Sequence, residues 1–160
     1  MRNILSLILF FIMAASIAFL AGCGSGASDF IPKDDLPEGI TFIDSADTTD
    51  CDSISGTIGE NTVSFSQAVY EQSEPGDAYV LVLECKDEEA ANIMLEYLDA
   101  EVLDNSVYTK QLSEVNGSEA IEASISPPPE YVFLWQQDNF VFMVLGNSRD
   151  SSFNLASSIK

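Results

Sequence analysis

Carboxylates are the main side chains available for catalysis, because the 160-residue chain contains no histidine. Without imidazole there is no Ser-His or Cys-His nucleophile pair, and the commonest general base and metal ligand are missing. Ser157 and Lys160 match the Ser-x-x-Lys spacing of some acyl-transferring enzymes, but the companion motifs of those enzymes are absent. We attribute that match to chance and expect a protein without catalytic residues.

The densest acidic group consists of Asp44, Asp47, Asp50 and Asp52. Oxygen ligands suit Ca²⁺, but this segment has neither the glycine nor the distal glutamate of an EF-hand loop. We therefore interpret the group as a solvated acidic linker, and we expect no metal and no cofactor.

Cys23 stands at the end of an uncharged run, residues 4–21, which follows the basic Arg2. A short positive start, an apolar middle and a small-residue exit at Ala21 and Gly22 are typical of a secretory signal. The run is also about as long as a membrane-spanning helix, which needs roughly 18 to 20 residues. An uncleaved N-terminal anchor is therefore the alternative interpretation.

The tetrapeptide Leu20-Ala21-Gly22-Cys23 resembles the lipobox of prokaryotic lipoproteins. The resemblance implies that the Cys23 thiol carries lipid and that the chain is cut just before it. It also implies that the mature protein is anchored to the cell membrane and faces the outside. Residues 24–29 are mostly small, and we interpret them as a flexible tether.

Two cysteines, Cys51 and Cys85, remain in the exported part of the chain, which favours a disulfide between them. The alternative is that Cys85 is a small buried hydrophobic residue and Cys51 an unmodified thiol. Asn116-Gly117-Ser118 is a glycosylation sequon, and the sequence leaves its occupancy open.

The mature chain is strongly acidic, with a net charge of −21 from 26 acidic and five basic side chains after Arg2 is removed. Binding to nucleic acid or to bare anionic lipid headgroups depends on clustered Lys and Arg in the protein, so both are poor partners for this chain. We expect no nucleic-acid partner.

The pattern after residue 53 indicates one domain built from hairpins. Residues 62–71 and 78–85 form two strand-like runs, and Asp87 starts a helical pattern. Further hairpins are expected around Asn116-Gly117 and Asp138-Asn139, and a short helix follows Asp150. We expect an α+β fold, an antiparallel sheet with two helices packed on one face. The predicted organisation is a signal peptide (1–22), a lipidated cysteine with an acidic linker (23–52) and a single domain (53–160). The short apolar patch at residues 40–43 allows the linker to add one edge strand to the sheet.

The last hairpin is apolar on both faces. With a two-residue turn at Asp138-Asn139, Trp135 is opposite Phe142 and Phe133 is opposite Val144. The aliphatic face fits against helices. The aromatic face is either core or a binding surface, and it comprises Tyr131, Phe133, Trp135, Phe140 and Phe142.

Trp135, residues 140–146 and residues 153–159 resemble the C-terminal part of small secreted or lipid-anchored domains of unknown function in archaea and bacteria. That resemblance implies no catalytic residues. We expect a lipid-anchored, non-catalytic extracytoplasmic domain that binds a protein partner or a small ligand. The alternatives are a structural component of the cell envelope and an enzyme that uses carboxylates and a metal.

Overall fold

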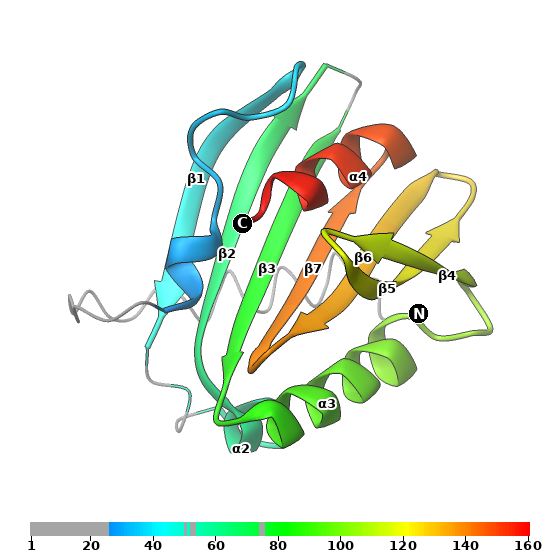
Figure 1. The fold of residues 1–160 in the computed structure, drawn as a ribbon. Coiled ribbons are helices and arrows are strands. Elements are labelled where there is room, and N and C mark those ends of the chain that lie inside the picture. The colour runs from blue at the N-terminus through cyan, green and yellow to red at the C-terminus, as the bar shows by residue number, and fades with distance from the viewer. Residues whose placement is uncertain (1–25, 50, 52–53, 74–75) are drawn as a thin grey trace.

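A computed structural model describes residues 26–49, 51, 54–73 and 76–160. Its seven strands form one antiparallel sheet in the order β1-β2-β3-β7-β6-β5-β4 (Figure 1). The strands are β1 (Ile40–Thr48), β2 (Thr62–Gln72), β3 (Asp77–Cys85), β4 (Thr109–Val115), β5 (Ser118–Ile125), β6 (Glu130–Gln137) and β7 (Phe140–Gly146). The helical segments are η1 (Ala27–Phe30), α2 (Thr57–Asn61), α3 (Glu88–Tyr97), η2 (Leu98–Val102) and α4 (Arg149–Ser158). The predicted antiparallel α+β fold is confirmed.

Local turn chemistry fixes the hairpins. Asn116 and Gly117 both have positive φ, 51° and 85°, as a tight turn between two strands requires. Asp138 has φ 53° at the turn between β6 and β7. The predicted register there is also confirmed, because Trp135 pairs with Phe142 and Phe133 pairs with Val144.

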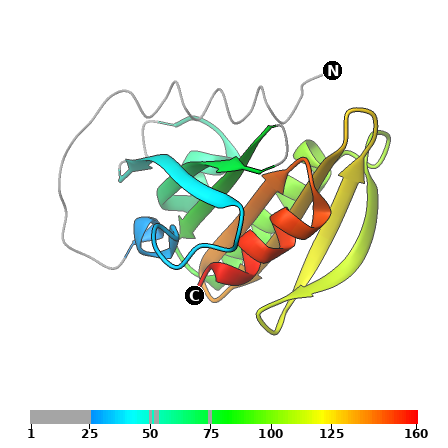
Figure 2. The same cartoon turned by 90° about the horizontal axis from the view of Figure 1, so that it is seen from above.

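The prediction that both helices cover one face of the sheet is wrong. Met94 of α3 belongs to a buried cluster with Leu83 and Met143, whereas Leu155 of α4 belongs to a second cluster with Phe142. Because side chains alternate along a strand, residues 142 and 143 face opposite sides of the sheet. The two helices therefore cover opposite faces, as Figure 2 shows.

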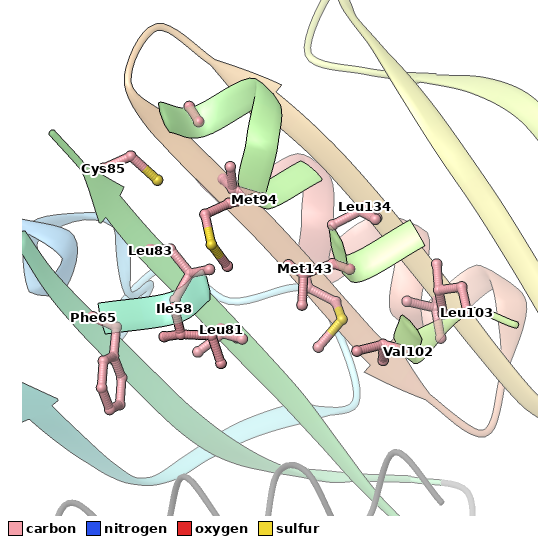
Figure 3. Packing of buried hydrophobic residues seen from close by; sticks show 14 of the residues in the cluster. Ile58, Phe65, Leu81, Leu83, Cys85, Met94, Val102, Leu103, Leu134 and Met143 are labelled. Atoms are coloured by element: carbon pink, nitrogen blue, oxygen red, sulfur yellow. The ribbon is translucent and has the colours of Figure 1, made fainter. Parts of the chain in front are cut away.

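Helix α3 begins as the sequence predicts and buries one side. The Asp87 side chain accepts a hydrogen bond of 2.8 Å from the backbone N–H of Ala90, which caps the helix. At its other end the helix widens into the π-helical turn η2. Figure 3 shows the cluster under these elements, with Met94 among the apolar side chains of the sheet.

The segment expected to be a linker, residues 23–52, packs on the sheet where the structure describes it, and the edge strand expected from its apolar patch is present as β1. Ala27 and Ile31 are core residues, and β1 pairs along β2. The Tyr70 hydroxyl donates a hydrogen bond of 2.9 Å to the backbone carbonyl of Pro32, and this bond fixes the segment to the sheet. The domain therefore begins at about residue 27 rather than 53, since burying these apolar side chains outweighs the acidic composition around them.

The predicted signal and Cys23 lie outside the described residues. Within the described part of the chain, no helix has the length and apolar character needed to cross a membrane.

Candidate functional site

The aromatic face of the last hairpin is core rather than an exposed binding surface, which decides between the two alternatives that the sequence leaves open. Phe133, Trp135 and Phe142 are at most 1% exposed, while Tyr131 and Phe140 are half-buried. The cluster that contains Phe133, Trp135 and Phe142 also contains Leu155 of α4 and, at its margin, Phe30 of η1. The four residues of η1 are too few to show helical periodicity, so their place over this face could not be predicted from the sequence.

Cys51 and Cys85 are both buried in the cluster under α3. Burial, followed by the negative charges of Asp87, of a Cys51 thiolate and of Glu84, raises the pKa of the Cys85 thiol to about 12. Such a thiol is a poor nucleophile, because the reactive thiolate is disfavoured. Cys51 and Cys85 share one cluster, but no disulfide joins them in the described part of the chain. Their pairing in the exported protein stays a prediction.

The acidic group expected to be a solvated linker, residues 44–52, does not form one cluster where the structure describes it. Asp44 and Asp47 lie on β1, three residues apart, and therefore point to opposite faces of the sheet. The Asp47 carboxylate accepts a hydrogen bond of 2.6 Å from the Ser66 hydroxyl. Asp50 and Asp52 lie outside the described residues. In the ranges that the structure describes, no three acidic or cysteine side chains gather as a metal site would require.

The sequon asparagine, Asn116, has a structural role in the turn between β4 and β5. Its side-chain nitrogen donates a hydrogen bond of 2.6 Å to the backbone carbonyl of Ile159, just beyond α4. A glycan on this nitrogen would replace one of its two N–H hydrogens and leave one to donate.

An ion pair between the exposed Arg149 and the buried Glu122 joins the first turn of α4 to β5. Arg149 Nε and Nη2 donate hydrogen bonds of 2.7 Å each to the two carboxylate oxygens of Glu122, which is 5% exposed. The Arg149 guanidinium also lies 6.0 Å from the Phe133 ring centre and 5.9 Å from that of Phe153. These hydrogen bonds hold the pKa of Glu122 below its usual value despite its burial. The carboxylate therefore stays ionised and serves structure rather than proton transfer.

The Glu122→Gln variant is expected to lose an acid-sensitive part of the stability. Because the pKa of Glu122 is lower in the folded protein than its usual value of 4.5, the ionised group stabilises the fold above that pH. This contribution disappears as the pH falls through the lower, folded-state pKa. Thermal unfolding from neutral pH to about pH 3 should show wild type and variant converging on acidification. Glu114→Gln, an exposed change on β4, is the matched control. A gap between wild type and Glu122→Gln that does not narrow with acidification would contradict this account.

Strand β4 forms one edge of the sheet, because in the strand order it adjoins β5 alone among the described strands. Its Leu112 is 74% exposed, more than any other large hydrophobic side chain in the described ranges. The pairing with β5 runs from Thr109 to Val115 without a bulge. An unbroken edge of this kind presents backbone N–H and C=O groups for another strand to pair with.

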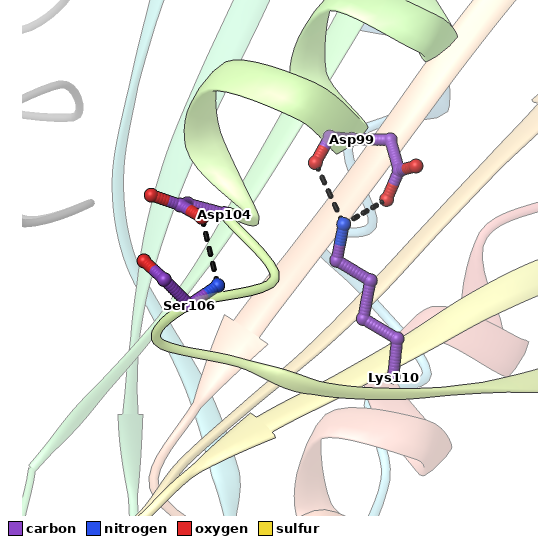
Figure 4. A network of polar contacts seen from close by, with 4 residues as sticks. All are labelled: Asp99, Asp104, Ser106 and Lys110. Atoms are coloured by element: carbon purple, nitrogen blue, oxygen red, sulfur yellow. Dashed lines mark hydrogen bonds and ion pairs between the residues drawn. The ribbon is translucent and has the colours of Figure 1, made fainter.

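Contacts at both ends hold β4 in place. Lys110 Nζ donates hydrogen bonds to the Asp99 backbone carbonyl at 2.8 Å and to its carboxylate at 2.6 Å, which links β4 to η2 (Figure 4). In the preceding turn, the Ser106 backbone N–H donates a hydrogen bond of 2.8 Å to the Asp104 carboxylate. At the other end, the Asn116 bond holds the strand beside α4. These contacts hold the edge strand in one position within the domain.

Comparison with known proteins gives one solved structure and no family. The chain matches no protein-family model, and no curated protein matches it. A solved structure of a GTP binding regulator from Thermotoga maritima is similar, with 16% sequence identity and a TM-score of 0.45. The similarity covers 78% of this chain and 82% of that one. A likeness at this level carries no information about function.

Proposed function

We propose that the protein is a lipid-anchored, non-catalytic extracytoplasmic domain that binds a protein partner through the edge strand β4. The anchor is lipid on Cys23, at the outer side of the cell membrane. The observation that carries the binding proposal is the bulge-free edge of β4 with Leu112 exposed upon it. In strand addition, backbone hydrogen bonds supply affinity and alternate side chains supply specificity.

The opposite edge of the sheet is less suited to strand addition. Strand β1 has an irregular register between Phe42 and Asp44, whereas β4 pairs with β5 without one. Both edges carry charged side chains, but a bulge is a further device by which proteins block pairing at a sheet edge. This contrast supports β4 rather than β1 as the binding edge.

The side chains of β4 specify the chemistry of the partner segment. Glu114 lies directly opposite Glu119 on β5, and like charges in such a pair repel. Leu112 lies two residues before Glu114, so both side chains project from the same side of the strand. A complementary partner is an extended segment with an apolar residue opposite Leu112 and a Lys or Arg opposite Glu114.

Site-specific photo-crosslinking in native membranes tests this proposal. A benzophenone amino acid at position 112 should give a discrete protein adduct. The same probe at position 43, which is 54% exposed on β1, is the matched control and should not. Glu114→Lys, combined with the probe at 112, should reduce the adduct because it repels a basic partner residue.

Equal adducts from both edges, or none from position 112, would contradict the role of β4. The absence of any adduct from position 112 would favour the alternative of a structural envelope component.

A further inference from the structure

The distance between the anchor and the folded domain is short. Three residues lie between Cys23 and Ala27, which is 1% exposed. The four steps from Cα to Cα reach at most about 14 Å when the chain is fully extended. This argument rests on the lipid-anchor proposal, which places Cys23 at the membrane surface.

The first segment of the domain is held firmly on the sheet. The Phe30 ring centre lies 4.6 Å from that of Phe140 and 5.3 Å from that of Phe142. Ile31 is 5% exposed, and Tyr70 donates its hydrogen bond to the carbonyl of Pro32. Movement of η1 away from the sheet would break these contacts, so η1 does not lengthen the connection to the anchor.

The position of Phe30 identifies the end of the domain nearest the anchor. Phe140 is the first residue of β7, next to the β6–β7 turn, and it pairs with Glu84 near the end of β3. Figure 1 shows η1, in blue, beside the end of β1 that carries the arrowhead. The 11-residue strand β2 is about 36 Å long, so its other end lies beyond the reach of the connection.

We infer that the domain lies against the outer surface of the bilayer with one fixed end, formed by η1 and the β6–β7 turn. The partner of this surface is the lipid headgroup layer. Strand β4 stays clear of the bilayer, because η1 contacts β2 and β3 and β4 is the strand farthest from them in the sheet order. The short connection therefore presents the β4 edge outward.

The bilayer-facing end lacks the charge pattern of a headgroup-binding site. Its Asp29 and Asp138 are acidic and exposed, and a basic cluster is what attracts anionic lipids. The lipid on Cys23, rather than attraction to headgroups, holds this end of the domain near the bilayer. A zwitterionic bilayer is consequently sufficient for the orientation.

Paramagnetic broadening of backbone amide signals tests the orientation. The lipidated mature protein is placed in phosphatidylcholine nanodiscs that contain a gadolinium-chelate lipid, so that the ion sits at the headgroup layer. Amide signals of Asp29 and Asp138 should be lost, and those of Asp77 and Leu112 should be retained. A variant with about 20 Gly/Ser residues inserted after Ser25 gains roughly 25 Å of mean reach and should recover the lost signals while staying on the disc.

Two failures can be told apart. Uniform broadening of all four amides in the wild-type protein on the disc, or no recovery in the spacer variant, would overturn the fixed orientation while leaving the anchor in place. A mature wild-type protein that carries no lipid and does not stay on the disc would overturn the anchor, and the orientation with it.

Discussion

Replacing Trp135 by alanine should destabilise the domain by about 3–5 kcal/mol, the usual cost of deleting a large aromatic side chain from a core. Trp135 is 1% exposed and stacks on Phe142, with ring centres 5.0 Å apart and planes 12° from parallel. The change removes the ring and leaves a cavity between the sheet and its cover. Chemical denaturation of the mature domain measures the loss.

Leu112→Ala is the matched control for Trp135→Ala, because Leu112 is 74% exposed. Surface changes of this kind usually stay within about 0.5 kcal/mol. If Trp135→Ala were as mild as Leu112→Ala, the aromatic face would be a solvent-exposed binding surface after all.

The Gly59→Ala variant should lose at least about 3 kcal/mol of stability, the upper end of the cost of overpacking. A Cβ atom at residue 59 would lie 1.7 Å from the backbone oxygen of Ile54 and 2.9 Å from that of Cys51. Backbone atoms cannot rotate away as a flexible side chain can, so α2 or the segment before it must shift. Thermal unfolding would show a large fall in Tm.

Glu60→Ala, at the exposed neighbouring position in α2, separates this steric effect from helix propensity. That variant should unfold close to the wild-type temperature, since alanine is the best helix former. A Gly59→Ala domain with wild-type Tm would mean that residues 51 and 54 do not pack on α2 in the way described.

The hairpins could be predicted from the sequence because their signals are local. Asn116, Gly117 and Asp138 adopt the positive φ values that tight turns need, and these turns set the register of their strands. The capping role of Asp87 is local in the same way. Each of these features depends on a few neighbouring residues.

The placement of the helices could not be predicted, because it depends on the whole sheet. Strands β3, β6 and β7 are apolar on both faces, so their pattern does not say which face receives which helix. Since each face needs a cover, one helix goes to each. Similarly, Ala27 and Ile31 became core residues through contacts with distant strands.

The position of β4 at an edge of the sheet also could not be predicted from the sequence. The hairpin pattern predicts that β4 pairs with β5, but it does not say whether a further strand lies on the other side. Strand β7 inserts between β3 and β6, and this insertion leaves β4 at the edge. The exposure of Leu112 follows from that strand order rather than from its neighbours in sequence.

The mass of the mature N-terminus tests the central claim, that the protein is held at the membrane by lipid on Cys23. Intact-protein mass spectrometry with fragmentation, on protein extracted from native membranes, measures it directly. We predict a chain that starts at Cys23, lacks residues 1–22 and carries a lipid adduct on that cysteine. A membrane-extracted chain that retains Arg2 and an unmodified Cys23 would contradict the claim and favour an uncleaved N-terminal anchor.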